Sequence, residues 1–440
     1  MRKLLIRGAR TPDGQARDIA ICEGRIAETV TSPDWVIDAE GLFVLPGFVD
    51  VHTHLRQPGR EDAETVLTGS QAAARGGYTA VHAMANTQPV ADTAGVVEQV
   101  WRLGREAGFA EVRPIGAVTT GLGGEHLAEL GAMANSRAKV RIFSDDGLCV
   151  SDPLVMRRAL EYVKAFDGII AQHAQEPRLT EHAQMNEGVV SAEIGLPGWP
   201  SMAEEAIIAR DVLLAQHVNS RVHICHVSTQ GSVEIIRWAK SRGIKVTAEV
   251  TPHHLFLTDE LVRSYDPVYK VNPPLRTEAD VEALREALAD GTIDIIGTDH
   301  APHPGEHKSC EWTAAAMGMV GLETAFSVVT TAMEDYDFTI ADIARVMSTA
   351  PAQIAGLTHH GTLLSRDSRL AIGAPANLTL VDPAATTYVI PETHATKARN
   401  NPFAGLELTG TVVHTVFYGH QTVTEGNITE GHPEVSTWIR

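Results

Sequence analysis

Two histidines one residue apart mark the segment of the chain best suited to metal chemistry. Asp50, His52 and His54 alternate in the stretch Asp-Val-His-Thr-His. Alternate residues of an extended strand point to the same side, so we expect these three side chains on one face. Two imidazoles placed in this way can chelate one divalent cation. The segment therefore predicts one half of a metal site.

Histidine or aspartate also follows four later apolar segments. The residues are Asp145 and Asp146, His173, His226, and Asp299. Together with the first pair they offer nitrogen and oxygen ligands, a set that suits Zn²⁺, with Mn²⁺ and Co²⁺ as alternatives. Ions of this kind polarise carbonyl groups and lower the pKa of water toward neutrality. The pattern thus predicts a metal site that can direct water at a carbonyl carbon.

The charge balance narrows the class of ligand. The 440 residues include 36 Lys and Arg against 55 Asp and Glu, a formal net charge of −19, and 20 histidines. Such a balance argues against a nucleic-acid or anionic membrane partner, because phosphate groups are bound by clustered Lys and Arg. A small anionic substrate needs only a few local cations. We therefore expect a small-molecule substrate, no nucleic acid and no membrane.

The amino terminus and the cysteines indicate the compartment. The apolar run 4–6 is interrupted by Arg7 and is shorter than the roughly 7–15 residues of a signal-peptide core. No stretch approaches the roughly 20 apolar residues of a membrane span. The four cysteines lack CxxC spacing, which favours reduced thiols over disulfides or a thiolate zinc site. We expect a cytoplasmic protein.

Short apolar strands alternate with amphipathic helices between residue 47 and about residue 355. The predicted strands are Phe48–Val51, Thr79–Ala83, Val112–Val118, Val140–Phe143, Gly168–Gln172, Arg221–Cys225, Lys245–Val250 and Thr292–Gly297. The clearest predicted helices are Ala63–Arg75, Ala203–His217, Ser232–Arg242 and Glu278–Ala289. This alternation is typical of a parallel sheet, and eight units predict a (β/α)₈ barrel. A doubly wound sheet is the alternative, but no glycine-rich phosphate turn follows the first strand.

The two ends of the chain have a different sequence pattern, in which short apolar strands are interrupted by turns. They predict a small β-sandwich that the two ends build together, because neither end alone has enough strands for a stable sheet. Toward the carboxyl end we expect strands over 376–381, 387–390, 406–418 and 421–424, with turns that include Gly410. The predicted division is residues 1–46 and 359–440 for the sandwich and 47–358 for the catalytic barrel.

A barrel would bring the histidines and aspartates together, because the carboxyl ends of its strands meet at one face. His253 and His254 follow the seventh strand and are further candidates. Adjacent residues of an extended chain face opposite ways, so at most one of them could join the site. We favour structural roles for both.

Several motifs resemble one known family, in order along the chain. They are Asp50-Val-His-Thr-His-Leu-Arg-Gln-Pro-Gly59, Asn86-Thr-Gln-Pro-Val-Ala-Asp92, Phe143-Ser-Asp-Asp-Gly147, Thr251-Pro-His-His-Leu255, Asn272-Pro-Pro-Leu-Arg276, Gly297-Thr-Asp-His-Ala-Pro-His303 and Gly321-Leu-Glu-Thr324. The set is similar to the dihydroorotases of the amidohydrolase superfamily, in their bacterial class I form. The resemblance covers essentially the whole chain, including the divided β-sandwich.

The resemblance implies reversible cyclisation of N-carbamoyl-L-aspartate to L-dihydroorotate in pyrimidine biosynthesis. By the same resemblance, His52 and His54 hold one zinc ion, and His173 and His226 hold a second. Asp146 bridges the two ions. Asp299 contacts the first ion and is the catalytic acid and base. One zinc ion per chain stays open as an alternative to two.

The resemblance also implies a set of substrate contacts: His54, Leu55, Arg56, Asn86, Asn272, His303, Met317 and Gly318. Two positions depart from the wider pattern. Many superfamily members bridge their metals with a carboxylated lysine where this chain has Asp146, and the spacing from His173 favours Asp146 over Asp145. Met317 stands where the family often has Phe.

The sequence also allows other functions, which differ in the substrate or in the class of protein. Hydantoinase, dihydropyrimidinase and allantoinase share the paired histidines, but the missing lysine and the sequence His54-Leu55-Arg56 favour dihydroorotase. A non-catalytic scaffold is disfavoured because the full ligand set is present. A homodimer is expected on base rates. Association with aspartate transcarbamoylase stays open.

Overall fold

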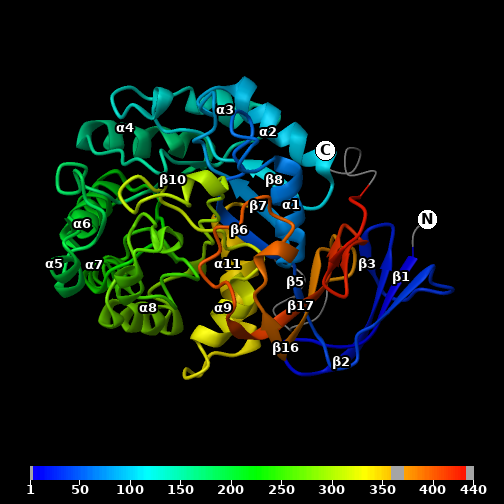
Figure 1. Ribbon diagram of the computed structural model, residues 1–440. Helices are drawn as coiled ribbons and strands as arrows, with labels where there is room; N and C mark the ends of the chain where they lie inside the picture. Colours follow the sequence, from blue (N-terminus) through cyan, green and yellow to red (C-terminus); the bar gives the residue numbers. More distant parts are fainter. Residues whose placement is uncertain (1–2, 358–370, 433–440) are drawn as a thin grey trace.

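The computed structural model describes residues 3–357 and 371–432 as a mixed α/β protein. Figure 1 shows a large body of helices and strands beside a smaller sheet, whose strands come from the first and the last parts of the described chain. The predicted boundary between residues 358 and 359 lies outside the described residues. Within the described part of the chain, none of the helices has the length and apolar character needed to cross a membrane.

The eight predicted inner strands are all present. They are β6 (Phe48–Thr53), β7 (Tyr78–Ala83), β8 (Glu111–Pro114), β9 (Ile142–Phe143), β10 (Ile169–Gln172), β13 (Val222–Ile224), β14 (Val246–Val250) and β15 (Ile295–Ile296). Parallel ladders join β6–β7–β8 and β9–β10–β13–β14–β15. Single parallel bridges connect these groups at Gly116–Phe143 and at Thr53–His300. The inner strands are therefore paired in a closed order, in which the segment after β15 lies beside β6.

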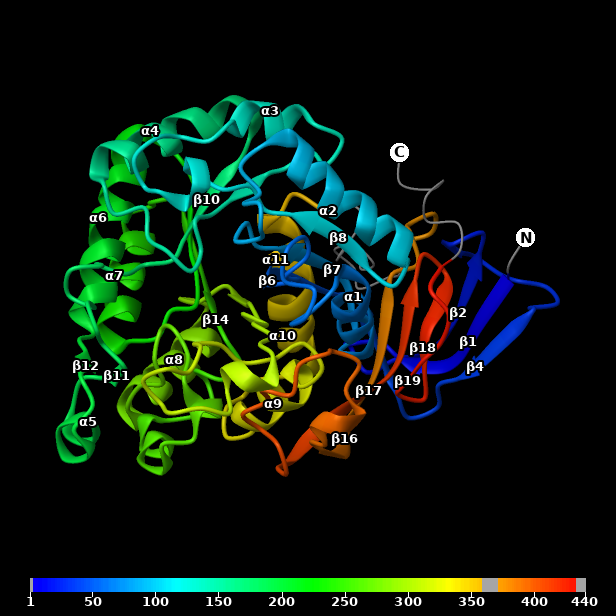
Figure 2. The ribbon, with the colours of Figure 1, turned by 45° about the horizontal axis from the view of Figure 1, so that its top comes forward.

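Helices alternate with these strands and lie around them in Figures 1 and 2. They are α1 (Val66–Arg75), α2 (Ala94–Ala107), α3 (Leu130–Asn135), α4 (Pro153–Val163), α6 (Met202–Val218), α7 (Gln230–Ser241), α8 (Glu278–Asp290), α9 (Ala325–Ala332), α10 (Ile340–Ala344) and α11 (Ala350–Ile354). Local signals set their ends: the Asp152 carboxylate caps α4 beside Pro153, and α2 ends at Gly108 with a φ of 71°. The segment between β10 and α6 contains three further short elements, which are β11 (Met185–Asn186), α5 (Val189–Ile194) and β12 (Gly198–Trp199).

Apolar side chains fill both sides of the inner strands. One buried cluster includes Val49, Ala80, Ile169 and Ile295 from four strands, together with Ala352 from α11. A larger cluster lies between the strands and the surrounding helices. Because both faces are covered, these strands are mostly apolar, as parallel strands usually are. A few buried polar residues lie within them, among them Asp50 in β6, His223 in β13 and Glu249 in β14.

The two ends of the chain build one nine-stranded sheet. Its strands are β1 (Lys3–Arg10), β2 (Ala16–Cys22), β3 (Arg25–Ala27), β4 (Trp35–Asp38), β5 (Phe43–Pro46), β16 (Leu378–Tyr388), β17 (Glu407–Phe417), β18 (His420–Thr424) and β19 (Asn427–Ile428). The antiparallel pair β5–β16 joins the amino-terminal and carboxyl-terminal parts. The expectation that the two ends pair with each other is confirmed.

Two details of this sheet differ from the sequence prediction. The strands expected at 376–381 and 387–390 form one strand, β16, whose register against β17 shifts between Asp382 and Thr386. The Asp382 carboxylate accepts the amides of Ala384 and Ala385, and residues 383–385 lie opposite the single residue Gly410 without ending the strand. Gly410, expected in a turn, lies inside β17 at this irregularity with a φ of 95°. The prediction of a turn at Gly410 was wrong.

Candidate functional site

Six of the predicted metal ligands meet in one buried cluster at the ends of the inner strands. Nitrogen and oxygen atoms of His52, His54, Asp146 and Asp299 form one group, all within 4.8 Å of one another. Asp146, His173 and His226 form a second group under the same limit. Asp146 belongs to both groups, and every member is buried.

The Asp146 carboxylate lies between the two pairs of histidines. Its Oδ2 atom is 3.4 Å from His52 Nε2 and 3.3 Å from His54 Nε2. Its Oδ1 atom is 3.2 Å from His173 Nδ1 and 3.1 Å from His226 Nε2. Each oxygen thus faces one imidazole pair, the arrangement needed by a carboxylate that bridges two cations. Asp299 Oδ1 approaches only the first pair, at 3.4 Å from His52 Nε2 and 3.1 Å from His54 Nε2.

The chemistry of the clustered side chains fits a divalent metal ion. The Nε2 atom of His52 is buried and has no hydrogen-bond partner among the described residues, although it faces two carboxylates. A buried imidazole nitrogen without a partner is costly unless a cation completes it. Cys225 groups with His52 and Glu249, but it belongs to neither of the two groups that share Asp146. The remaining nitrogen and oxygen donors fit the metals expected from the sequence.

The backbone is strained at three residues of this region. Arg56, His226 and Asp299 have φ values of 60°, 30° and 45°, in the left-handed region that residues other than glycine rarely adopt. Such strain persists only where the surrounding structure enforces it, and it is common in active sites. Two of these residues, His226 and Asp299, are members of the cluster.

Asp50 supports the cluster without joining it. Its carboxylate accepts hydrogen bonds from the amide and hydroxyl of Thr298 and from the amide of His52. Burial raises the pKa of Asp50 to about 7, against the opposing effect of these hydrogen bonds. Asp50 therefore ties the end of β6 to the residue before Asp299.

Glu249 of β14 is a functional candidate that the sequence interpretation missed. Its carboxylate accepts hydrogen bonds from His52 Nδ1 at 2.5 Å, His223 Nε2 at 3.1 Å and the His226 amide at 3.2 Å. Burial opposes its ionisation, but the charge and hydrogen bonds of the histidines hold the pKa of Glu249 well below its ordinary value. A carboxylate that accepts a hydrogen bond from His52 Nδ1 keeps the proton on that nitrogen. The Nε2 atom of His52 is then free to bind a metal ion. An acid within the apolar run Val-Thr-Ala-Glu-Val was the available signal.

A cavity of about 210 Å³ opens on the cluster. Among its lining residues are the predicted substrate contacts His54, Arg56, Asn86, Asn272, His303, Met317 and Gly318. Leu55 does not line it, because its side chain belongs to the hydrophobic core. The structure therefore brings all but one of the predicted contacts to the same cavity.

Arg56 places a positive charge in this cavity. The side chain is buried, its Nε atom donates to the Pro302 carbonyl at 3.1 Å, and no carboxylate of the described residues forms an ion pair with it. Burial and the neighbouring charge of Arg60 lower the pKa of Arg56 to about 10, so it remains charged at neutral pH. A buried guanidinium without an acidic partner is suited to an anionic ligand.

Two asparagines connect the cavity wall to the histidines. Asn86 Oδ1 accepts a hydrogen bond from His54 Nδ1 at 2.9 Å. Asn272 Nδ2 donates at 3.1 Å to Gln175 Oε1, which also accepts from His173 Nε2 at 2.8 Å. The Oδ1 atom of Asn272 is buried with no hydrogen-bond partner in the described chain. This free acceptor is available to a donor group on a ligand.

Comparisons with known proteins identify the family. A family model described as Dihydro-orotase-like matches residues 41–232. A protein named Dihydroorotase from Streptomyces coelicolor is 65% identical over 98% of this chain and 100% of its own length. The chain belongs to the dihydroorotase family. Relatives with the same name from Leifsonia xyli and Mycobacterium tuberculosis are 63% and 53% identical, each over 97% of this chain and 97% and 99% of their own lengths.

Solved structures show that the fold of this dihydroorotase-family chain is shared more widely. An L-hydantoinase from Arthrobacter aurescens superposes with a TM-score of 0.85 at 24% identity, covering 98% of both chains. A dihydropyrimidinase from Brevibacillus agri gives 0.81 at 21% identity, covering 98% of this chain and 97% of its own. These structures show the shared fold, and the dihydroorotase relatives at 53–65% identity make the chain an enzyme of the cyclic amidohydrolase class.

His253 and His254 stay outside the ligand groups of this dihydroorotase-family site. His254 bonds through Nδ1 to the Thr251 hydroxyl and donates from Nε2 to the Pro273 carbonyl at 3.1 Å. Burial lowers the pKa of His253 to about 4, so it is neutral. Neither residue is a member of the metal-ligand groups found in the described chain.

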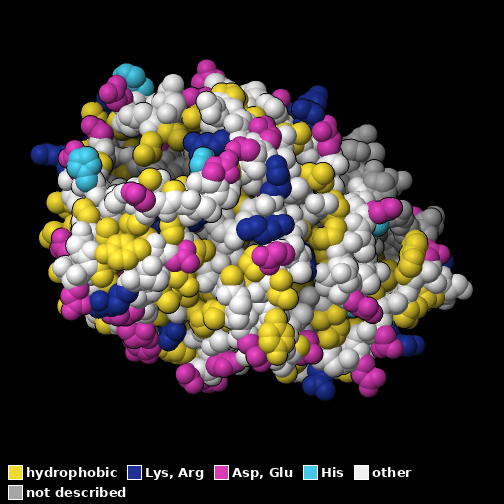
Figure 3. Space-filling model, viewed as in Figure 1, with side chains coloured by type: hydrophobic (Ala, Val, Ile, Leu, Met, Phe, Trp, Pro, Cys, Tyr) yellow, Lys and Arg dark blue, Asp and Glu magenta, His cyan; other side chains and the backbone are white. Residues whose placement is uncertain are grey.

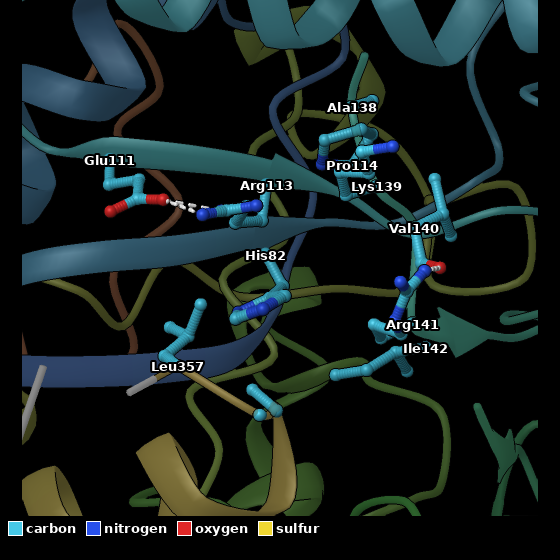
Figure 4. A pocket seen from close by; sticks show the side chains of 12 residues that line it. His82, Glu111, Arg113, Pro114, Ala138, Lys139, Val140, Arg141, Ile142 and Leu357 are labelled. Atoms are coloured by element: carbon cyan, nitrogen blue, oxygen red, sulfur yellow. Dashed lines mark hydrogen bonds and ion pairs between the residues drawn. The ribbon is translucent and has the colours of Figure 1, made fainter. Parts of the chain in front are cut away.

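A second cavity of about 220 Å³ lies beside β8, near the end of α11 (Figure 4). His82, Arg113 and Arg141 are among its lining residues, and Glu111 pairs with Arg113. None of the residues expected to act in the dihydroorotase site lines it. Acidic and basic side chains are interspersed on the face shown in Figure 3.

Proposed function

We propose that this chain is a dihydroorotase of the bacterial class I form, which interconverts N-carbamoyl-L-aspartate and L-dihydroorotate in de novo UMP biosynthesis. The observation that carries the proposal is the unpaired Arg56 guanidinium in the same cavity as the His/Asp cluster. Both the open and the cyclic compound bear a carboxylate and a C–N bond next to a carbonyl. The names of the close relatives support the same assignment.

We assign two zinc ions to the cluster, with one ion as the alternative. His52, His54 and Asp299 would hold the first ion, His173 and His226 the second, and Asp146 both. Bound zinc supplies Lewis acidity that polarises the ring carbonyl and lowers the pKa of water. Glu249 keeps His52 in the tautomer that can ligate.

Asp299 is the catalytic acid and base in this proposal. Burial opposes its ionisation, but the His54 hydrogen bond and the charges of His52 and His54 lower the pKa of Asp299 to about 2. The carboxylate is therefore ionised at neutral pH, which is the form that a general base needs. In ring opening it takes a proton from the attacking water and delivers it to the departing ring nitrogen as the C–N bond breaks. Ring closure runs through the same transfers in reverse.

The cavity wall orients the substrate. The Arg56 fork matches the two oxygens of the exocyclic carboxylate. Asn86, Asn272 and the backbone at Met317–Gly318 meet its polar ring groups. Burial, with the charges of Arg56 and Lys308, lowers the pKa of His303 to about 3, so His303 acts as a neutral group. Leu55 contributes its backbone only, because its side chain is in the core.

We also propose that the closed order of strands over residues 47–358 is a (β/α)₈ barrel, and that residues 1–46 and 359–440 form a β-sandwich. A cytoplasmic homodimer is proposed with it. Aspartate transcarbamoylase is a further candidate partner. Size-exclusion chromatography of the mixed proteins would test whether the two associate.

The substrate assignment predicts a defined specificity. The purified protein is expected to hydrolyse L-dihydroorotate and to carry one or two zinc ions per chain by elemental analysis. Dihydrouracil, hydantoin and allantoin lack the exocyclic carboxylate that Arg56 would bind, and they should be hydrolysed far more slowly. Hydantoin or dihydrouracil turnover exceeding dihydroorotate turnover would assign the site to the enzyme class of the solved neighbours.

Replacing Arg56 with glutamine tests the carboxylate contact. The change removes the charge and one arm of the fork, so kcat/KM for dihydroorotate should fall about 100-fold, mainly through KM. Arg60→Gln is the matched control, because Arg60 lines the same cavity but is exposed. Equal losses in the two variants would mean that general positive charge, and not the Arg56 fork, recognises the substrate.

A further inference from the structure

A segment from the carboxyl-terminal sheet returns to the active site. Between β16 and β17 the chain leaves the sheet and lies against the body of the molecule (Figure 2). The Glu323 carboxylate accepts the amides of Ala395 and Thr396 at 3.0 and 3.1 Å. The Glu64 carboxylate accepts the Lys397 amide at 3.3 Å. These buried acids hold the segment beside the strand ends.

Asn400 is a residue of this segment that bonds three residues lining the site cavity, Ala301, His303 and Gly318. Its side chain is 5% exposed, and both ends of the amide form hydrogen bonds. Oδ1 accepts the His303 amide at 3.2 Å, and Nδ2 donates to the carbonyls of Ala301 and Gly318 at 3.0 and 3.1 Å. The Asn400 carbonyl accepts the Val320 amide at 3.1 Å. One residue thus joins two segments that are separate in the sequence.

The two joined segments carry proposed substrate contacts. His303 Nε2 donates to the Met317 carbonyl at 2.8 Å, and the Gly318 amide donates to the Lys270 carbonyl at 2.9 Å. Gly318 has a φ of 143°, and a Cβ atom there would lie 2.7 Å from His303 Nε2. The contact between the segments is therefore tight, and a small shift of either one changes the cavity wall.

His303 also separates the site from a neighbouring cavity. It lines both the site cavity and an adjoining cavity of about 460 Å³, whereas Asn400 lines only the adjoining one. Asn400 therefore stands behind the wall and does not itself border the site. Any effect on the substrate must pass through His303 and the Met317–Gly318 backbone.

We propose that Asn400 is a positioning residue for substrate binding, which fixes the spacing between His303 and the Met317–Gly318 backbone. The inference rests on the proposed function, which makes these two groups substrate contacts. Only an amide supplies one acceptor and two donors in this geometry. Aspartate has the same shape, but its second carboxylate oxygen would replace Nδ2 and face the carbonyl oxygens of Ala301 and Gly318 without a proton to donate. Alanine removes all three bonds.

The kinetic test compares Asn400→Asp and Asn400→Ala with the wild-type enzyme. Both variants should raise KM for dihydroorotate about 10-fold or more, because buried donors and acceptors lose their partners and the wall shifts. The value of kcat should stay within about threefold and the metal content unchanged, since Asn400 bonds neither Asp299 nor a histidine side chain.

Asn401→Ala is the matched control for loss of a buried amide from the same segment. Asn401 is 2% exposed, and its Oδ1 accepts the Phe403 amide at 2.9 Å, away from the cavity. This variant should lower the melting temperature and leave KM unchanged. A rise in KM as large as that of Asn400→Ala would show general loosening and overturn the proposal.

Hydrogen exchange gives a second measurement that does not depend on the reaction. Peptides covering residues 301–303 and 317–320 should exchange faster in Asn400→Ala and normally in Asn401→Ala. Unchanged exchange in both peptides, or KM within twofold of wild type in both Asn400 variants, would overturn the proposal. Failure of the wild-type enzyme to act on dihydroorotate would instead overturn the proposed function, and the exchange result would still decide the role of Asn400.

Discussion

Replacing Asp299 with asparagine is expected to lower kcat by about 10²–10⁴-fold, the usual contribution of a positioned general acid and base. Asparagine preserves the size of the side chain and one oxygen near His54, but it cannot accept and return a proton. The carboxylate oxygen now lies 3.1 Å from His54 Nε2, at the open side of the cluster that faces the cavity. Steady-state rates in both directions, with zinc content measured on the same sample, would check this.

Metal content separates a proton-transfer role from a ligand role for Asp299. It should stay near normal in Asp299→Asn, because an amide oxygen can still ligate and the other members of the cluster remain. Asp294→Asn is a suitable control, since this carboxylate bonds Lys240 and the Ala248 amide, outside the ligand cluster. Near-native kcat in Asp299→Asn would remove Asp299 from the proton-transfer role.

The strand ends were predictable because they combine two strong signals. His52, His173 and His226 each end a short apolar run, and the alternation of such runs with amphipathic helices indicates parallel strands whose ends converge. The convergence then follows from topology and needs no knowledge of individual contacts. This explains why the grouping of the ligands could be inferred before any distance was known.

Supporting contacts were harder to predict because they depend on tertiary partners. Glu249 lies inside an apolar strand, and only the fold shows that it meets His52 and His223. Asn400 is 97 residues from His303 in the sequence, within a segment that local patterns indicate only as a loop. Periodicity reports which face of an element is buried, but it does not report which polar group lies opposite. The supporting residues therefore required the structure.

Local turn rules also failed where tertiary pairing outweighed them. The Asp-Pro pair at 382–383 and Gly410 both indicate a break, yet β16 and β17 pair continuously apart from register shifts. The mutual pairing of two eleven-residue strands and the hydrogen bonds to Asp382 offset the missing amide of the proline.

Replacing Asp146 with alanine is expected to remove bound metal. In the proposed two-ion arrangement, His173 and His226 would be left as the ligands of the second ion, whereas the first ion would keep His52, His54 and Asp299. The zinc content should therefore fall to at most one ion per chain, and the remaining ion should be lost more readily to a chelator. Loss of the second ion should lower dihydroorotate turnover by orders of magnitude, since the cluster also fixes Asp299.

Asp145 provides the matched control, because it is the neighbouring buried carboxylate and was the alternative ligand. Its oxygens accept the amides of Val118 and Thr119 at 2.8 and 3.0 Å and the Thr119 hydroxyl, so its hydrogen-bonding capacity is used within the fold. Asp145→Ala should lower the melting temperature and retain zinc, because it leaves buried amides unpaired but removes no atom that faces the histidines. Full zinc content in Asp146→Ala, together with zinc loss in Asp145→Ala, would transfer the bridging role to Asp145 and contradict the geometry of the cluster.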